Sequence, residues 1–280
     1  YYLELRNYFA GRSVLSKAYS LSKQVCDAAE QTRASYMSIV YEKLTMFNDA
    51  GICALTSSSD FSSEQLANQP TALFLKIPDE KDTRHNLAAI FILNIYKALI
   101  KIASSYEDLS LPRNVYFILD EFANMPPLSD VDSMVSAARS RDIRMTFIIQ
   151  NFAQLNDVYG KEIAETIRSN CGNLIYLLTT ELAALEEISK LCGEKKSKDK
   201  DKTASTPLVT VSDLQKMKLF EAIILRSRLN PLKTKLKPSF EIDWGKTFPK
   251  ADFIERPKGE IGLFDLKEFV KEKKKEYEDF

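Results

Sequence analysis

The sequence has few of the residues that build metal sites and histidine-based catalytic sites. Its 280 residues include one histidine and four cysteines, and no two cysteines stand in a Cys-x-x-Cys spacing. Structural zinc sites draw on clusters of Cys and His, and a hydrolytic triad needs a histidine of its own. We therefore expect neither kind of site, and we interpret the cysteines as buried thiols of a reducing compartment.

Long apolar runs are also missing. The most apolar segment, residues 87–100, is about 14 residues long and is interrupted by Asn94 and Lys97, whereas a membrane-spanning helix needs about 20 apolar residues. No signal peptide is visible at the start of the sequence. We therefore expect the chain itself to be soluble and cytoplasmic.

Glycine is scarce, and its placement excludes one nucleotide-binding motif. The eight glycines are scattered, and the sequence contains no Gly-x-x-x-x-Gly-Lys-Ser/Thr. In that motif a loop of backbone N–H groups and a lysine cradle the phosphates of a nucleotide. Gly245-Lys246-Thr247 lacks the first glycine, because Phe240 stands at that position, and we regard it as a coincidence.

Charge is balanced overall but unevenly distributed. Lys plus Arg and Asp plus Glu each number 39, so the formal net charge is zero. Residues 1–193 hold 18 basic and 23 acidic residues, and residues 194–280 hold the remaining 21 and 16. A basic tail of this kind is a hint of a polyanionic or acidic partner, although it is more often only a solvated surface.

The order of apolar patterns predicts helices first and an α/β alternation afterwards. Residues 1–48 repeat apolar positions at three- and four-residue steps, as amphipathic helices do. Predicted strands follow at residues 71–77, 114–121, 144–150, 174–179 and 222–226. Predicted helices lie between them at residues 86–103, 129–140 (with Ser129 and Asp132 as a capping box), 161–169 and 181–191. This alternation predicts an α/β fold with a mostly parallel sheet covered by helices.

Two adjacent carboxylates end the predicted strand at residues 114–121. Asp120 and Glu121 follow a run of Val, Ile, Tyr and Phe that is typical of a buried strand. An unpaired buried carboxylate is costly, so the strand is expected to open into a site at its C-terminal end. An apolar strand followed by Asp-Glu is the Walker B pattern of nucleotide hydrolases. The structural alternative is that the two acids cap the next segment or pair with arginine.

Two further polar features lie at strand ends. Gln150 ends the next predicted strand, where it could contact a γ-phosphate or an attacking water, or could simply bond to buried backbone. Arg139, Arg141 and Arg144 form a basic cluster before that strand. They could pair with local carboxylates, or one could reach a neighbouring subunit's phosphate as an arginine finger.

Taken together, these residues carry a family resemblance. The segments ILDEFANMPPL, ARSRDIRMTFIIQNFAQLNDVYG, ETIRSNCGNLIYLLTT and ISKLCG closely resemble the coupling proteins of type IV secretion systems, the TraG/TraD-like conjugation ATPases. Upstream the likeness includes QTRASYMSIVYEKL, LTSSSDF and TALFLKIPDEKD, and downstream LVTVSDLQKMK and EAIILRSR. It covers roughly residues 31–228, and the combination of these motifs at their spacings is highly specific.

The resemblance implies a domain organisation and site roles. Residues 1–58 would be part of an all-α domain, residues 59–236 a RecA-like nucleotide-binding domain, and residues 237–280 a C-terminal extension. By composition, residues 194–206 are expected to be a mobile loop. Asp120 would help to hold Mg²⁺, Glu121 would polarise the attacking water, and Gln150 would sense the γ-phosphate of ATP. Arg139 is the first choice for the arginine finger, with Arg141 and Arg144 as alternatives.

The resemblance also implies partners and a place in the cell. Family members are hexameric ATPases anchored in the bacterial inner membrane. At its cytoplasmic face they recruit relaxase-bound single-stranded DNA or protein effectors and deliver them to other type IV secretion components. ATP and Mg²⁺ are therefore expected for the full-length protein, together with relaxosome partners and a homo-hexamer.

The sequence departs from the family pattern in two places. Asp142 stands where the family usually has glycine after Arg-Ser-Arg, and Asp tolerates a left-handed turn better than most residues. The second departure is that the P-loop motif Gly-x-x-x-x-Gly-Lys-Ser/Thr is missing. In this family the P-loop and the membrane helices precede the all-α domain. We therefore expect the sequence to be the C-terminal part of a coupling protein that does not hydrolyse ATP alone. Two alternatives stay open at this point: a non-hydrolysing module that binds substrates or the relaxosome, and a hexameric DNA translocase of the FtsK/HerA kind.

Overall fold

The computed structural model describes residues 2–59, 61–77, 82–196, 205–247 and 249, with 267–269, 271, 272 and 275 near the C-terminus. The chain divides into two compact units. The first, called the N-terminal unit, contains the residues up to Asp60 and those after Ala251, and the second, called the core unit, is Phe61–Ala251. The domain limits expected at residues 58 and 236 stay a prediction.

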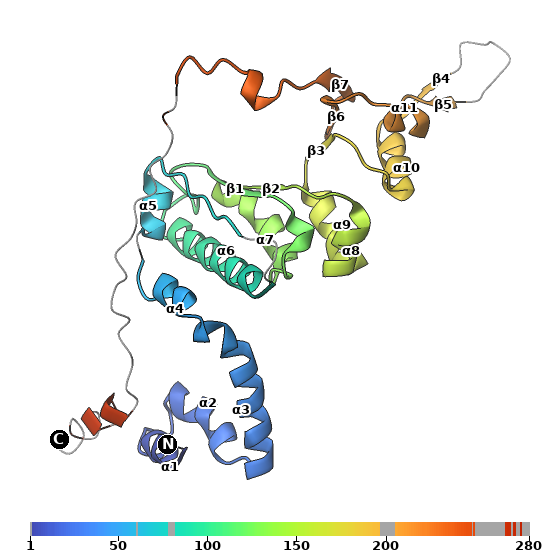
Figure 1. Ribbon diagram of the computed structural model, residues 1–280. Helices are drawn as coiled ribbons and strands as arrows, with labels where there is room; N and C mark the ends of the chain where they lie inside the picture. The colour runs from blue at the N-terminus through green and yellow to red at the C-terminus, as the bar shows by residue number, and fades with distance from the viewer. Residues whose placement is uncertain are drawn as a thin grey trace. The chain divides into compact units, whose positions relative to one another are not determined.

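The N-terminal unit is helical, as the periodicity predicted (Figure 1). Its elements are α1 (Tyr2–Ala10), α2 (Lys17–Cys26), α3 (Glu30–Leu44), the 3-10 helix η1 (Thr45–Asn48) and α4 (Ala50–Thr56). Ser16 caps α2 through its hydroxyl, and Asp49 caps α4 through its carboxylate. Among the residues of this unit with described side chains, Ile52 alone is buried, so these helices have little core of their own.

The core unit alternates helices and strands. Its first elements are α5 (Ser63–Asn68), α6 (Asp82–Ala103), β1 (Val115–Leu119), η2 (Phe122–Asn124), α7 (Val131–Ala138), η3 (Arg139–Arg141) and β2 (Ile143–Phe147). Its remaining elements are α8 (Phe152–Tyr159), α9 (Lys161–Asn170), β3 (Asn173–Tyr176), α10 (Leu182–Leu191), β4 (Glu194–Lys196), β5 (Ser205–Pro207), α11 (Val211–Gln215), β6 (Glu221–Arg226), β7 (Leu232–Lys235) and η4 (Ser239–Glu241). The α/β fold class is confirmed.

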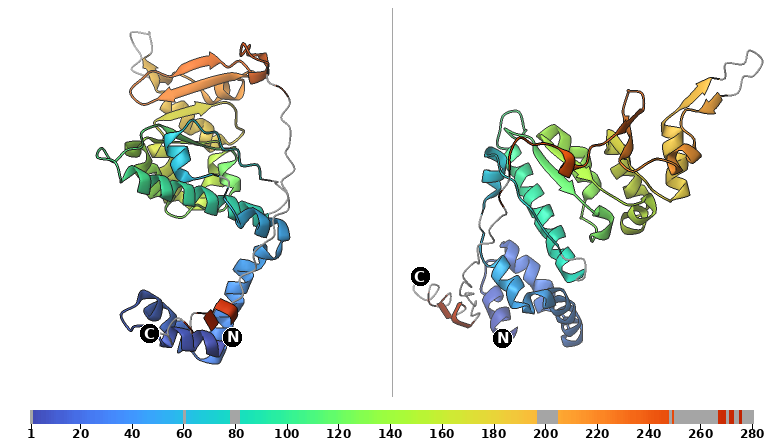
Figure 2. Two further views of the ribbon diagram at one scale, coloured as in Figure 1. Left: turned by 90° about the vertical axis from the view of Figure 1, so that its left-hand side faces the viewer. Right: turned by 45° about the horizontal axis from the view of Figure 1, so that its top comes forward.

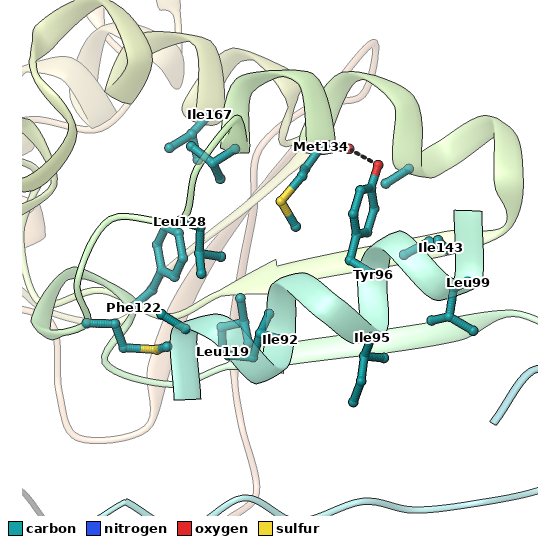
Figure 3. Packing of buried hydrophobic residues seen from close by; sticks show 14 of the residues in the cluster. Ile92, Ile95, Tyr96, Leu99, Leu119, Phe122, Leu128, Met134, Ile143 and Ile167 are labelled. Carbon is teal, nitrogen blue, oxygen red and sulfur yellow. Dashed lines mark hydrogen bonds between the residues drawn. The ribbon is translucent and has the colours of Figure 1, made fainter. Parts of the chain in front are cut away.

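Strands β1 and β2 form a parallel pair, with Val115 opposite Ile143 and Leu119 opposite Phe147. The first hydrophobic core joins the inner face of this pair to α6, α7, α8 and α9. Figure 3 shows this packing, in which Ile92, Ile95, Tyr96 and Leu99 of α6 are drawn with Leu119 of β1 and Ile143 of β2. Tyr96 donates a hydrogen bond from its hydroxyl to the carbonyl of Met134 at 3.3 Å, which ties α6 to α7. The core therefore fixes the strand ends from which the site is built.

The two faces of β1 differ in exposure. Val115, Phe117 and Leu119 pack against the first core, whereas Tyr116 and Ile118 are 65% and 70% exposed. A parallel pair usually has both faces covered, because crossover helices pack on each side. In this structure the helices of the core unit cover one face of the pair, and the other presents apolar side chains to the outside.

Strands β3, β6 and β7 form a second sheet, which is antiparallel throughout (yellow and orange strands in the left view of Figure 2). Its second core packs Tyr176 and Ile223 against α10 and α11. Arg168 of α9 joins the two parts of the unit, because it bonds Glu187 of α10 at 2.7 Å and lies over the Phe152 ring of α8 at 4.5 Å. The strands after β2 were expected to continue a mostly parallel sheet, but β3 pairs with β6, and β6 with β7, in antiparallel register. The short turn between β6 and β7 permits only the antiparallel arrangement of those two strands.

Two local predictions are wrong. Residues 71–77, expected as a strand, form no strand pairing, and Phe74 is 91% exposed. An apolar run predicts extended backbone, but a strand also requires a partner in register. The capping box at Ser129 is absent, because α7 begins at Val131 with Asp130 at the N-cap in left-handed conformation and without a side-chain cap.

Three other expectations are corrected in part. Helix α6 has 22 residues, and residues 84–103 are long and apolar enough to cross a membrane, although its inner face lies in the first core. Residues 194–196 pair with 205–207 in a hairpin, while the middle of the predicted mobile loop lies outside the described residues. Of the four cysteines Cys192 is buried, which raises the pKa of its thiol, but Cys171 is exposed.

Candidate functional site

The two acids lie where the sequence placed them, directly after β1. Glu121 adopts a left-handed backbone (φ 49°, ψ 40°), a conformation that is uncommon for a residue with a side chain. The turn is held from the next residue, because Phe122 is fully buried and its N–H donates to the carbonyl of Ile148 at 3.0 Å. Backbone strain of this kind collects at functional sites, since the surrounding structure must impose it.

The Glu121 carboxylate is held by a residue that sequence reasoning did not single out. Asn124 donates from its side-chain amide to Glu121 Oε2 at 3.0 Å, and its backbone N–H donates to the Glu121 carbonyl at 2.8 Å. The second contact belongs to the 3-10 turn η2. The sequence could have indicated this contact, because Asn124 stands three residues after Glu121 in the DEFAN segment and one helical turn brings such residues together.

Aromatic packing supports this turn from below. The Phe122 ring stacks on Tyr159 of α8 with centroids 5.3 Å apart, and it lies 4.5 Å from the Phe147 ring. The Tyr159 hydroxyl accepts a hydrogen bond from the backbone N–H of Leu128 at 3.2 Å. Burial raises the pKa of Tyr159 to about 12, so the phenol is neutral at physiological pH. The acids therefore rest on a rigid apolar base.

Gln150 lies at the same edge of the strand pair. It follows β2 by three residues, and Ile148 donates its N–H to the Leu119 carbonyl at 2.9 Å, so both chains leave the sheet side by side. The Gln150 side chain is exposed and bonds to no described residue. The alternative in which Gln150 is a buried side chain bonded to backbone is therefore wrong.

The chain after Gln150 is anchored by two further polar residues that the sequence prediction missed. Asn151 caps α8 by accepting from the N–H of Gln154 at 2.8 Å. Glu181, which follows β3, accepts from the N–H of Phe152 at 2.7 Å. The segments after β2 and β3 thus meet at one place. Asn before an amphipathic segment was a readable N-cap signal, whereas the contribution of Glu181 depends on the tertiary fold.

The arginine cluster lies at the opposite end of the strands. Arg139 and Arg141 are in η3, directly before β2 begins, whereas the acids follow the end of β1. A five-residue strand is roughly 16 Å long at about 3.3 Å per residue. The structure therefore brings Asp120, Glu121 and Gln150 together and does not bring Arg139 to them within one chain.

The three arginines differ in what they bind. Arg144 donates to Asp142 Oδ1 at 2.8 Å and to the carbonyl of Arg139 at 2.9 Å. Arg141 donates to the Ala137 carbonyl and to the Ser140 hydroxyl. The Arg139 guanidinium is exposed and contacts no described partner. Asp142 has φ 58°, which confirms that this turn needs a left-handed residue.

The carboxylates suit a metal bound together with phosphate rather than a protein-only metal cage. Among the described residues no three His, Cys, Asp or Glu side chains gather into a metal-binding group. Asp120 is exposed, and its Oδ1 accepts from the Glu121 N–H at 3.0 Å, which leaves its other oxygen open. Mg²⁺ commonly takes one or two carboxylates and completes its shell with water and phosphate oxygens. The pair Asp120 and Glu121 fits that requirement.

Comparison with known proteins identifies the family. A family model described as type IV secretory system conjugative DNA transfer matches residues 10–246. The chain belongs to this family. It is 29% identical over 167 residues to the protein VirD4 of Rhizobium radiobacter, covering 57% of this chain and 23% of VirD4. It is 24% identical over 203 residues to a probable conjugal transfer protein TraG of Sinorhizobium fredii, covering 64% of this chain and 30% of TraG.

Solved structures of the coupling protein TrwB share the fold. Unbound TrwBdeltaN70 aligns with a TM-score of 0.56 at 19% identity, over 64% of this chain and 44% of that chain. TrwB in complex with the GTP analogue GDPNP aligns with a TM-score of 0.63 at 18% identity, over 84% and 58%. Another TrwB structure is in complex with ADP and Mg²⁺. The chain thus spans about a quarter of the length of VirD4 and about half of the TrwB structures.

Proposed function

We propose that this chain is the Walker B part of a conjugative coupling ATPase. The observation that carries the proposal is the shared strand edge, where Asp120 and Glu121 directly follow β1, Gln150 follows the parallel neighbour β2, and all three side chains are exposed. Family membership supplies the reaction class, and the solved TrwB complexes support nucleotide and Mg²⁺ binding within the fold. The three residues come from neighbouring parallel strands, as in other sites of open α/β sheets.

Each residue then has a role that its geometry supports. Glu121, fixed by Asn124, would accept a hydrogen bond from the attacking water and orient it. Asp120 would hold a Mg²⁺ ion, whose charge offsets that of the phosphates. Gln150, exposed at the same edge, would contact the terminal phosphate. The phosphate cradle would come from outside these 280 residues, because they contain no Gly-x-x-x-x-Gly-Lys-Ser/Thr.

The wider role follows from the same family. We propose that the working protein is a homo-hexamer at the cytoplasmic face of the bacterial inner membrane. It would pass single-stranded DNA or protein substrates, together with their relaxase or relaxosome proteins, to other secretion components. The family match favours this role over that of an FtsK/HerA-like translocase.

Glu121→Gln in the protein carrying its phosphate-binding half tests the catalytic assignment. We expect hydrolysis of ATP to fall at least about 100-fold, the usual minimum for a lost general base, while nucleotide affinity changes little. Glu107→Gln is the matched control, since it makes the same change at an exposed glutamate in the loop before β1, for which no catalytic role is proposed. Unchanged turnover in Glu121→Gln would refute the assignment.

A second candidate function is a binding module without hydrolysis. The missing phosphate cradle within these residues favours it. Two measurements separate the candidates. A binding module would recruit cargo equally well with Glu121→Gln. It would also show no ATP turnover in any form that includes the upstream coding sequence.

A further inference from the structure

A short loop after β7 presents two aromatic rings to the outside. Phe240 is 81% exposed and Trp244, the only tryptophan of the chain, is 61% exposed. Single exposed hydrophobic side chains are ordinary on protein surfaces, whereas two large rings within one short loop can offer a platform for a ligand. The loop follows β7 and includes η4, the short orange helix beyond β7 in Figure 1.

The loop is ordered by hydrogen bonds of its own. Trp244 donates its indole N–H to the carbonyl of Ser239 at 3.2 Å, and Glu241 donates its backbone N–H to the Pro238 carbonyl at 3.0 Å. Gly245 turns the chain with φ 63° and donates to Asp243 Oδ1 at 2.8 Å. Because the indole N–H is already used, the ring face is what remains available for recognition. Little ordering entropy would be lost on binding.

The base of the loop adds a third ring. Leu236 donates its N–H to the carbonyl of Phe220 at 2.7 Å, so the end of β7 lies beside the start of β6. Phe220 is 37% exposed and takes a left-handed backbone, φ 67°. Phe220 thus lies at the base of the loop, and we call the two rings within the loop, Phe240 and Trp244, the aromatic surface.

Lysines border this surface. Lys235 and Lys237 precede the loop and Lys246 follows it, and all three are exposed. None takes part in a salt bridge within the described residues, whereas Lys233 pairs with Glu221 at 3.2 Å. The acids of the loop are Glu241 and Asp243, and Asp243 is turned towards Gly245. Between Arg226 and Thr247 there are six basic residues and two acidic ones, so the segment is net positive.

We infer that the aromatic surface binds single-stranded nucleic acid, with bases stacked on Trp244 and Phe240 and phosphates near Lys235, Lys237 and Lys246. Exposed rings beside unpaired cations are the features that bind single strands without base readout. A duplex would bind less well, because its bases are already stacked on one another. The inference rests on the proposed function, to which it adds a binding site for the DNA cargo. Binding at this site does not require ATP hydrolysis.

Fluorescence of Trp244 tests the inference directly in the 280-residue chain. Titration with an oligo-dT of about 12 nucleotides, a length within the known range of site sizes, should quench the emission of the single tryptophan. A plot of log Kd against log salt should have a slope of about 2 in magnitude, since three phosphate contacts each contribute about 0.7. Duplex DNA of the same length should quench less.

Matched variants separate stacking from charge, with a fluorescein-labelled oligonucleotide as the probe. Trp244→Leu and Phe240→Leu should each weaken binding at least about 5-fold, and Trp244→Phe should retain most of it. Phe74→Leu removes an equally exposed ring elsewhere and should have no effect. Gln in place of Lys235, Lys237 and Lys246 should weaken binding and flatten the salt slope. The same change at Lys97, Lys101 and Lys190 should do neither.

Three results would overturn the inference. The first is no quenching by oligo-dT. The second is an equal loss of affinity when the three loop lysines and the three control lysines are replaced by Gln. Quenching of Trp244 by heparin to the same extent as by oligo-dT would count equally, since either result would show attraction by charge alone. The third is a Trp244 emission that does not change on adding oligonucleotide but shifts with protein concentration, which would identify a protein interface. The Glu121→Gln variant should bind oligo-dT normally. A failure of oligo-dT binding would therefore leave the ATPase proposal standing, and a failure of the ATPase proposal would leave the DNA-binding inference standing.

Discussion

The two ends of the β1–β2 pair are built from the same strands and do opposite things. At the carboxyl end Asp120 and Glu121 sit on a buried aromatic base and face outward with few bonds of their own. At the amino end Arg141 and Arg144 are bound into the local backbone, and of the three clustered arginines Arg139 alone bonds to no described residue. One end concentrates negative groups for a ligand, and the other presents an arginine that is not bound locally.

The difference explains how a single fold could serve two active sites. Charges roughly 16 Å apart on one sheet cannot act on the same phosphate, because an arginine side chain reaches only part of that distance. In a ring of identical subunits, however, the amino end of one copy can face the carboxyl end of the next. We therefore propose that Arg139 acts across a subunit boundary.

The largest expected effect comes from Arg139→Ala in the assembled protein. An arginine finger is worth about 10³–10⁵ in turnover, so ATP hydrolysis should be nearly lost. Mixing this variant with a Glu121→Gln variant should restore part of the activity, because some interfaces then combine an intact finger with an intact Glu121. No recovery in mixed assemblies, measured as turnover at several mixing ratios, would count against action between subunits.

The next largest effect tests the aromatic base at the carboxyl end. Phe122→Ala should lower the free energy of unfolding by about 3–5 kcal/mol, the usual cost of emptying a buried Phe site. Ile118→Ala, on the exposed face of the same strand, should change it by less than about 0.5 kcal/mol. Urea unfolding of both variants gives the comparison, and equal losses would show that the two faces are equally covered in solution.

The phenol of Tyr159 gives the carboxyl end a pH dependence. Its folded pKa of about 12 lies above the ordinary value of 10.0, so the neutral phenol is favoured by folding. The resulting stability, on the order of 2–3 kcal/mol, is complete below pH 10 and is lost as the pH rises through 12. Tyr159→Phe should show a shallower slope when unfolding is followed from pH 9 to 11, since Tyr96 and Tyr176, whose pKa values burial also raises, keep their contributions. Identical slopes would place the titration elsewhere.

The smallest effect distinguishes the arginines at the amino end. Arg144→Ala removes the contacts to Asp142 and to the Arg139 carbonyl, and should cost about 1 kcal/mol because the pair is more than a third exposed. Arg139→Ala should leave the free energy of unfolding unchanged within about 0.5 kcal/mol. Thermal unfolding of the isolated chain is sufficient, and a larger loss for Arg139→Ala would give it a structural role instead.

Much of this molecule could be predicted from local pattern. The helical start, helix α6 and strand β1 with its two acids were all predicted, because they depend on periodicity and on residues a few positions apart. The family resemblance rested on the same short segments, and the family match confirms it.

Tertiary structure decided the remaining features. The apolar run at residues 71–77 pairs with no strand, which only the three-dimensional arrangement reveals. The structure is also needed to tell the covered face of β1 from the exposed face with Tyr116 and Ile118. Glu181 meets Phe152 across 29 residues of sequence, and Arg139 is distinguished from Arg144 by contacts that no spacing reveals. Periodicity reports what one segment prefers by itself, whereas these features depend on which distant segment lies beside it.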